Sequence, residues 1–272
     1  MRPSFRIAVV AAAVSVTLGS GAAGAAGTPS TSAAGQRLHL VSAATRFHAA
    51  ESSNWFGYNQ GALDHSRFTS ISGDWIVPTA SPHTPGNDEF SSTWVGIGGG
   101  CPDTGCGSGA TDPTLIQAGT EQDVAANGAT SYNAWWEIIP EPETPISLPV
   151  HPGDQIHVAI AETLPGVWSI QISNVTTGQS FSTTTPYSGV GASAEWIEET
   201  PLLIGTNAGF SSLPNLTPVP FSNATVNGGN ANLDPSQEMD LIDGNGTVYS
   251  VPSAPNSTRN GFTACAWATT CS

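Results

Sequence analysis

The sequence contains no lysine, and its six basic residues are all arginines set against 21 Asp and Glu. Every acidic residue lies after residue 50, so residues 51–272 place the two cations Arg67 and Arg259 against 21 anions, a formal charge of −19. This charge excludes nucleic acid and an anionic membrane as partners. It suits an acidic environment, because Asp and Glu lose charge near their ordinary pKa values of roughly 3.9 and 4.3. An acidic secreted protein of any kind would explain the composition equally well.

Apolar runs of the roughly twenty residues that a membrane helix needs are also missing. The run IAVVAAAVSVTL at 7–18 is shorter; it follows Arg2 and Arg6 and precedes the small residues AGA at 23–25. A positive start, a short apolar stretch and a small-residue site are typical of a cleaved secretory signal. We therefore expect residues 1–26 to be a signal peptide and the protein to be secreted and extracellular.

The composition changes after this signal. Residues 27–50 are small and rich in Ser, Thr and Ala, with two arginines and no acid. Such a segment is either a linker or a short propeptide. Residues 51–272 are within the length range of one large all-β domain. We expect that domain to be a monomer without membrane contact.

Cysteines are few, and the four present suggest two disulfides in a secreted chain. Four cysteines allow three connectivities. The local pairs Cys101–Cys106 and Cys265–Cys271 are favoured, since each closes a Gly- or Thr-rich loop. No histidine lies within ligand spacing of either pair, so the sequence predicts no metal site there.

Helical periodicity is nearly absent, and short runs rich in Val, Ile, Thr and Trp recur between Gly, Pro, Asn and Asp. Residues 167–172 alternate between apolar and polar side chains, as in a sheet with one solvent-exposed face. Two stacked antiparallel sheets bury such strands, so we predict an all-β sandwich of the concanavalin or lectin-like kind. The clearest expected strands are residues 74–77, 92–97, 115–118, 132–139, 155–161, 167–172, 194–198 and 261–267.

Several hydrolase motifs are missing. There is no Gly-x-Ser-x-Gly turn for a serine nucleophile and no His-Glu-x-x-His for a zinc peptidase. The triplet DTG at 103–105 resembles the aspartic-peptidase motif, but that mechanism needs two carboxylates that share a proton. Here the triplet occurs once, between two cysteines, which favours a disulfide-closed loop.

Polar groups within two apolar strands remain as candidates. Gln117 lies in LIQAG at 115–119, and three glutamates surround an apolar pair in AEWIEE at 194–199. Buried polar groups are costly unless they are paired or used. Strand alternation places Glu195 and Glu199 on one face and Glu198 on the other, where we expect it to be solvated. A carboxylate that takes a proton from water, beside an amide that donates to an oxyanion, could hydrolyse a peptide bond. On its sequence alone, however, Gln117 is more simply a satisfied polar group in the core.

Six segments in the same order resemble the glutamic peptidases of the eqolisin type, peptidase family G1, and in particular a secreted bacterial-type branch. Each segment is a weak signal, but their order and spacing together are specific. The segments are SNWFGY (53–58), SGDWIVP (72–78), STWVGI (92–97), IQAGTE (116–121), YNAWWE (132–137) and AEWIEE (194–199).

The resemblance implies a β-sandwich acid endopeptidase that acts on polypeptides with no metal or cofactor. Residue by residue, the family's catalytic glutamine falls on Gln117 and its catalytic glutamate on Glu199. Glu199 would act as general base and then acid on the attacking water, and Gln117 would stabilise the oxyanion.

The resemblance also implies supporting residues. Trp94 and Trp135 match tryptophans of the substrate cleft, Glu121 and Glu137 match acids that orient the dyad, and Glu195 is the other acid of its motif. One departure is Gly98, where fungal members usually carry Asp, so a supporting hydrogen bond is in doubt.

A second hypothesis is a non-catalytic carbohydrate-binding or lectin-like sandwich with exposed tryptophans. Such modules often hold Ca²⁺ with clustered carboxylates. The segment DLIDGNG at 240–246 weakly resembles a calcium-binding loop but has too few ligands. The presence of both Gln117 and Glu199 on inward strand faces favours the peptidase, because a binding module has no need of both.

Overall fold

The computed structural model describes residues 37–39, 51–62, 67–103, 110–204 and 209–272. The predicted signal peptide and most of residues 27–50 lie outside these ranges. The described residues form β-strands and one short 3-10 helix, Pro235–Gln237, which confirms the all-β prediction. Within the same ranges, no helix has the length and apolar character required to cross a membrane.

The strands are numbered in chain order, and each of the expected runs lies in or overlaps one of them. Their bounds are β1 Arg37–Leu38, β2 Glu51–Ser52, β3 Trp55–Gly61, β4 Ser70–Ile76, β5 Ala80–Ser81, β6 Ser92–Gly98, β7 Leu115–Val124, β8 Thr130–Ile138, β9 Thr144–Ile146, β10 Gln155–Leu164, β11 Val167–Asn174, β12 Gln179–Pro186, β13 Ser193–Glu199, β14 Leu202–Leu203, β15 Gly209–Phe210, β16 Asn215–Leu216, β17 Val219–Val226, β18 Gly229–Asn230, β19 Glu238–Ile242, β20 Val248–Pro252 and β21 Phe262–Cys265.

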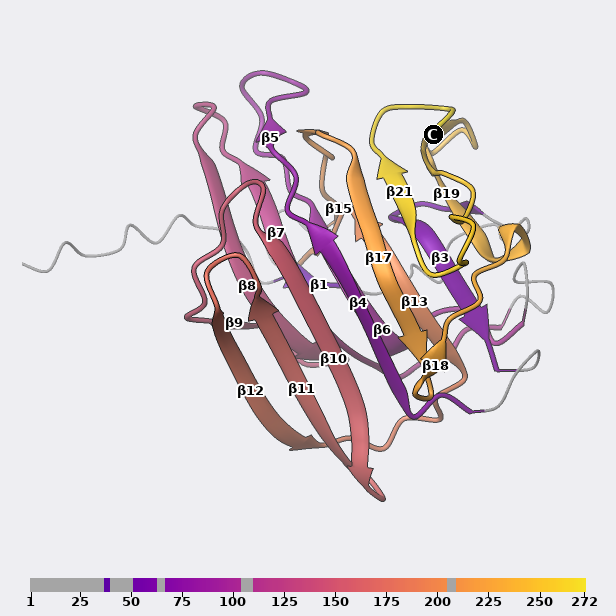
Figure 1. Ribbon diagram of the computed structural model, residues 1–272. Helices are drawn as coiled ribbons and strands as arrows, with labels where there is room; N and C mark the ends of the chain where they lie inside the picture. Colours follow the sequence, from indigo (N-terminus) through magenta and orange to yellow (C-terminus); the bar gives the residue numbers. More distant parts are fainter. Residues whose placement is uncertain (1–36, 40–50, 63–66, 104–109, 205–208) are drawn as a thin grey trace, which may run out of the picture. The chain divides into compact units, whose positions relative to one another are not determined.

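The strands form the predicted antiparallel sandwich. One layer has the order β12-β11-β10-β4-β17-β21 and the other β19-β3-β13-β6-β7-β8-β9. The first layer stands in front in Figure 1, with β4 over β6, β10 over β6 and β7, and β17 over β13. Strand β20 pairs with both β19 and β21, so the two layers are joined into one continuous sheet along this side.

The core lies between the layers. Strand β11 buries Trp168, Ile170 and Ile172 and exposes Gln171, which confirms the alternation expected there. Trp75 and Trp196 fill the same core, where the indole of Trp196 donates a hydrogen bond to the Ser72 carbonyl.

A second apolar cluster covers the opposite face of the β3-β13-β6-β7-β8 layer. This cluster explains why every residue of β6, β7 and β13 is buried, although only one side of each strand faces the main core. Its buried members are Trp55, Trp94, Leu115, Trp135, Ile197 and Met239.

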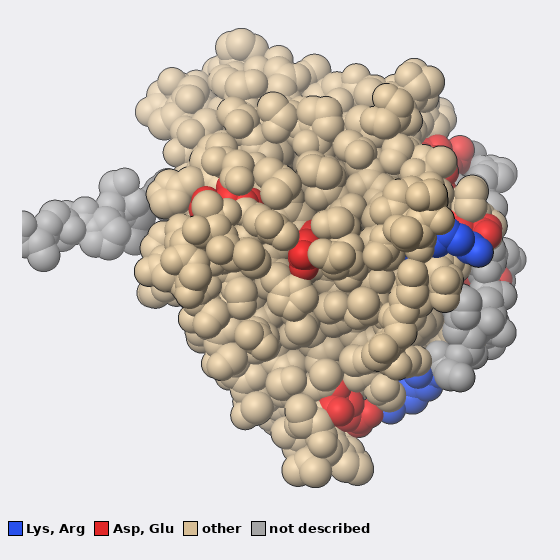
Figure 2. Space-filling view, in the orientation of Figure 1, with Lys and Arg blue, Asp and Glu red and all other residues tan. Residues whose placement is uncertain are grey.

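Many acidic residues lie in the interior. Ten of the Asp and Glu in the described ranges are buried, and the face shown in Figure 2 carries few acidic atoms. The expectation that Glu198 is solvated is wrong: it is fully buried and accepts a hydrogen bond from the Thr93 hydroxyl at 2.5 Å. Burial raises the pKa of Glu198 to about 8, with the charge of Glu199 adding to the effect.

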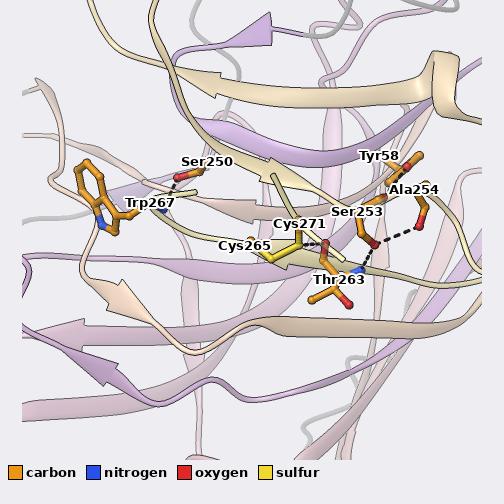
Figure 3. Close-up of a disulfide and its surroundings, with 8 residues drawn as sticks. All are labelled: Tyr58, Ser250, Ser253, Ala254, Thr263, Cys265, Trp267 and Cys271. Atoms are coloured by element: carbon orange, nitrogen blue, oxygen red, sulfur yellow. Dashed lines mark hydrogen bonds between the residues drawn. A yellow bond between two sulfur atoms is a disulfide. The ribbon is translucent and has the colours of Figure 1, made fainter. Parts of the chain in front are cut away.

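One of the two predicted disulfides lies in the described ranges. Cys265 at the end of β21 is bonded to Cys271, which fastens the last residues to this strand (Figure 3). Beside the bridge, the Trp267 backbone donates to the Ser250 hydroxyl on β20 at 3.0 Å. The other predicted pair involves Cys106, which lies outside the described residues.

The two ends of the strand order are β12 and β9. Strand β9 has three residues with Pro145 in the middle, and β12 ends at Pro186. Proline has no N–H to donate to a further strand.

Candidate active site

Strand register brings the candidate polar residues to one face in rows. Across the sheet, Glu195 on β13 faces Gly96 on β6, Gly96 faces Gln117 on β7, and Gln117 faces Glu137 on β8. The opposite face of these strands belongs to the main core. A second polar row runs Glu199, Ser92, Glu121, two rows further along the sheet.

An apolar row separates these two polar rows. It runs from Ile197 through Trp94 and Gly119 to Trp135. A Cβ on Gly119 would lie 2.6 Å from the Cβ of Trp94, so the glycine makes room for a large indole beside it. The row forms a floor of two tryptophans between the Gln117 row and the Glu199 row.

Glu199 is fully buried, and both of its carboxylate oxygens are held. The Trp94 indole N–H donates to Oε2 at 2.7 Å, and the Asn54 amide donates to Oε1 at 3.2 Å. Asn54 follows Ser53 in the first matching segment, but no sequence signal assigned it a role. These two donors fix the orientation of the carboxylate.

Both N–H groups of the Gln117 side-chain amide donate hydrogen bonds. Gln117 Nε2 donates to Glu137 Oε2 at 2.6 Å and to the backbone carbonyl of His39 at 2.8 Å. Burial raises the pKa of Glu137 to about 7; the charge of Glu199 adds to this, whereas His39 and the Gln117 hydrogen bond oppose it. Glu137 therefore orients the amide and is neutral in acid.

Glu195 lies apart from this pair. Two strand spacings separate it from Gln117, roughly 10 Å between Cα atoms. It is fully buried against Gly100, where a Cβ would lie 2.4 Å from Glu195 Oε1. Burial raises the pKa of Glu195 well above its ordinary value, and the Ser193 hydroxyl and the Gly100 N–H oppose that shift.

Residues 37–39, which the sequence placed in a linker or propeptide, lie on this site. Arg37 and Leu38 form β1, which pairs antiparallel with β14. The ring of His39 stacks on Trp135 with centroids 4.1 Å apart and planes 7° apart. His39 Nδ1 lies 3.1 Å from Glu199 Oε2, and its Nε2 lies 3.1 Å from Glu143 Oε2. His39 has no exposed surface.

Arg37 is buried in an anionic pocket beside His39. Its guanidinium contacts Glu121, donates to Asp123 Oδ2 at 2.9 Å, and lies 4.5 Å from the centre of the Phe90 ring. Burial raises the pKa of Glu121 well above its ordinary value and that of Asp123 to about 6, and the charge of Arg37 opposes both shifts. Glu121 is hydrogen-bonded to Arg37 and to the Glu143 carboxyl, whereas the resemblance implied a role beside Gln117 and Glu199.

The departure at Gly98 has a steric basis. Its φ is +96°, and a Cβ there would lie 1.9 Å from the Thr114 carbonyl oxygen. An Asp at this position would require the backbone to move. The supporting hydrogen bond expected from that Asp has no counterpart at residue 98.

Two groupings of polar residues resemble cation sites. His39, Glu121 and Glu143 offer ligand atoms within 4.8 Å of one another, but the Arg37 guanidinium already lies against Glu121 as a counterion. In the segment that resembles a calcium loop, Asp243 Oδ1 accepts a hydrogen bond from the backbone N–H of Asn245 at 2.8 Å. This bond closes the turn between β19 and β20. Neither grouping indicates a metal role.

Comparisons with known proteins identify the family. Residues 53–262 match the Peptidase A4 family. Aspergillopepsin-2 of Aspergillus niger is 28% identical over 207 residues, 68% of each chain. Scytalidopepsin B of Scytalidium lignicola is 30% identical over 135 residues, which are 49% of this chain and 45% of that protein.

Solved structures show the same fold. A scytalido-glutamic peptidase bound to a transition state analog inhibitor has a TM-score of 0.63 at 24% identity, over 79% of this chain and 98% of that one. The aspergilloglutamic peptidase of Aspergillus niger has a TM-score of 0.53 at 26% identity, over 65% of this chain and 99% of that one.

Proposed function

The chain belongs to the peptidase A4 family and is a peptidase, and on that premise we propose that it is a secreted acid endopeptidase whose catalytic pair is Gln117 and Glu199. One observation carries the proposal. A peptide carbonyl, that of His39, accepts a hydrogen bond from the Gln117 amide at 2.8 Å while the same residue contacts Glu199. A substrate residue in that place would put its carbonyl on the amide donor and its side chain beside the carboxylate.

The proposed reaction uses one amide donor and one carboxylate. Glu199 as carboxylate takes a proton from a water molecule while the water oxygen attacks the scissile carbonyl carbon. The carbonyl oxygen becomes an oxyanion that the Gln117 N–H stabilises, and removing one such donor typically lowers the rate on the order of 10²- to 10³-fold. Glu199 then gives its proton to the leaving nitrogen as the C–N bond breaks.

Gln117 can contribute a second hydrogen bond. Its Oε1 has no hydrogen-bond partner among the described atoms, so it is available to accept the other proton of the attacking water. The amide remains neutral at every pH, while Glu137 holds its nitrogen in place. The pair therefore combines one carboxyl group with one fixed dipole.

Acid operation is supported by the buried carboxylates. Glu137 and Glu198 have pKa values raised to about 7 and about 8, mainly by burial. Both are neutral in acid, where the fold avoids the cost of buried charge. Polypeptides are the substrate class of the family, and the floor formed by Trp94 and Trp135 would contact an extended peptide.

The test is digestion of unfolded casein by the whole chain at about pH 3.5 and pH 7, on either side of the ordinary Glu pKa. We expect cleavage in acid that EDTA does not affect, lost in Glu199→Gln and reduced on the order of 10²- to 10³-fold in Gln117→Ala. The exposed Glu141→Gln is the matched control. Wild-type proteolysis by Glu199→Gln would rule out Glu199 as the base.

Secretion and the monomeric state belong to the same proposal. Residues 1–26 supply the expected signal, so the N-terminal sequence of protein recovered from culture medium should begin after residue 26. Size-exclusion chromatography should give one chain per particle. Retention of the intact N-terminus inside cells would contradict secretion.

A further inference from the structure

We propose that a pocket at the end of β13 is a subsite that binds a basic side chain, lysine or arginine, of the polypeptide substrate through Asp243. The pocket has a volume of about 500 Å³ and lies beside the proposed catalytic carboxylate. Its assignment to the substrate rests on the proposed function. Its fit to a basic side chain depends only on the residues that line it.

Two walls of the pocket continue directly from the active site. Ser53 lines the pocket and precedes Asn54, whose amide donates to Glu199 Oε1 at 3.2 Å. Thr200 also lines it and follows Glu199, and its N–H donates to the Asn54 carbonyl at 2.9 Å. The two walls are therefore joined beside the carboxylate. Since an extended chain advances about 3.3 Å per residue, a peptide cut at Glu199 reaches the pocket within a few residues of the cut bond.

The interior of the pocket suits the hydrocarbon part of a long side chain. Leu213 and Ile242 are buried there, and the rings of Tyr249 and Trp267 lie with their centroids 4.9 Å apart. The Trp267 indole points away from the disulfide (Figure 3) and donates to the Pro214 carbonyl at 3.1 Å. Lysine and arginine bury their methylene groups along such apolar surface while the charged end stays in a polar environment.

The backbone of Trp267 supports a binding role. Its φ is +55°, a left-handed conformation that a bulky residue rarely adopts. The Cys265–Cys271 bond and the hydrogen bond from the Trp267 N–H to the Ser250 hydroxyl hold the residue in this conformation. Such backbone conformations persist where surrounding contacts fix them, and they cluster at ligand-binding sites. The indole is held in place before a ligand binds, which lowers the entropic cost of binding.

Asp243 supplies the charge for the cationic end. Its Oδ1 accepts the backbone N–H groups of Asn245 and Thr247 at 2.8 and 2.9 Å, which fixes the carboxylate in the turn between β19 and β20. The same hydrogen bonds hold the pKa of Asp243 below its ordinary value. Its charge is lost only as the pH falls through that lowered pKa, so Asp243 keeps its charge further into acid than an ordinary carboxylate does. Lysine and arginine are charged throughout this range.

Asp243 is the sole carboxylate among the described residues that line the pocket. Tyr249 lies near it, because burial and then the charge of Asp243 raise the pKa of Tyr249 to about 12. The phenol is therefore neutral in acid. The other titratable group of the lining is His83, whose ring stacks on Trp267 with centroids 3.6 Å apart and directs Nδ1 to Asn215 Oδ1 at 3.0 Å. The pocket thus has an anionic end at Asp243.

The first experiment measures specificity without assuming where the basic residue lies in the substrate. Casein is digested by wild type, Asp243→Asn and the exposed control Glu141→Gln at about pH 4, above the lowered pKa of Asp243, and the cut bonds are identified by mass spectrometry. We expect wild type and the control to cut at one fixed distance from lysine or arginine. Asp243→Asn should lose this enrichment, although it keeps an oxygen for the two N–H groups of the turn. Equal enrichment in all three proteins, or enrichment of apolar residues instead, would overturn the proposal.

The second experiment separates binding from the chemical step. A peptide cut in the first experiment is compared with the same peptide carrying norleucine, which has the hydrocarbon stem but no charge, in place of the basic residue. For wild type, we expect the norleucine peptide to have a KM roughly two- to fivefold higher, the range of an exposed ion pair, with kcat within about twofold. Asp243→Asn should have the higher KM for both peptides. Equal discrimination by the variant and wild type would overturn the role of Asp243.

Glu199→Gln separates a failure of the subsite from a failure of the proposed function. Its binding of short alanine peptides with one central lysine or norleucine is followed by tryptophan fluorescence, with and without Asp243→Asn. The lysine peptide should bind roughly two- to fivefold more tightly, and only when Asp243 is present. If wild type cuts no substrate while this preference is found, the proposed function fails and the basic-residue pocket stands. If wild type cuts casein in acid and the preference is absent, the pocket assignment alone fails.

Discussion

Glu198→Gln is expected to make the protein more stable at neutral pH and to leave its stability unchanged in acid. In the folded state burial raises the pKa of Glu198 from 4.5 to about 8. The folded state therefore binds this proton more tightly than the unfolded state does. The contribution to stability is complete below pH 4.5 and is lost as the pH rises toward about 8.

The size of the effect follows from the shift. The free energy of unfolding falls by about 1.4 kcal/mol for each pH unit above the ordinary value. By pH 7 the loss is about 3 kcal/mol, on the order of a fifth to a half of the stability of a typical domain. Gln keeps an oxygen for the Thr93 hydroxyl that now donates to Glu198 and carries no charge at any pH, so the variant should avoid the loss.

Urea unfolding of wild type and Glu198→Gln at about pH 4 and pH 7, below and well above the ordinary Glu pKa, measures this difference. The variant should gain about 3 kcal/mol at the higher pH and change by less than about 1 kcal/mol at the lower. The exposed Glu141→Gln should stay within about 0.5 kcal/mol at both. If Glu198→Gln and wild type unfold at the same urea concentration at pH 7, Glu198 is not the buried neutral acid that its surroundings require.

Three further changes test other contacts. Trp94→Phe removes the N–H that holds Glu199, so kcat on casein should fall roughly 10- to 100-fold while the circular dichroism spectrum is unchanged; a wild-type kcat would refute that role. Glu137→Gln should keep activity in acid within about fivefold, because Glu137 is neutral below its pKa of about 7 and its oxygen still orients the amide, whereas Glu137→Ala should lose on the order of 10²-fold; equal losses would argue against orientation. Replacing Cys265 and Cys271 by Ser opens a loop with a sequence separation of 6, which should lower the free energy of unfolding by about 2 kcal/mol, and an unchanged urea midpoint would contradict this.

The sequence was informative where local pattern and structure coincide. Alternation in residues 167–172 identified β11 because one side of that strand faces solvent. The glutamine and glutamate motifs identified two strands whose side chains share one face of a sheet. The burial of Glu198 was not predictable from its own strand, because it depends on the second layer packing over that face.

The position of residues 37–39 also could not be predicted from the sequence. A short stretch of small and basic residues carries no periodic signal, and its partners Glu121 and Asp123 are more than eighty residues away. The excess of arginine over acid in residues 27–50 was the available signal, since a basic segment is complementary to an acidic domain. Gly98 was recognised as a departure, but its tight contact with the Thr114 carbonyl emerges only from the paired strands.

The prolines at the two ends of the strand order bear on how this protein survives in acid solution. The formal charge of −15 at neutral pH keeps molecules apart, but protonation of the carboxylates removes that repulsion. Protection against aggregation must then come from the backbone. Pro145 within β9 and Pro186 at the end of β12 deny a neighbouring molecule a full ladder of donors for strand addition. The two prolines therefore limit strand addition at these two edges when the charge is lost.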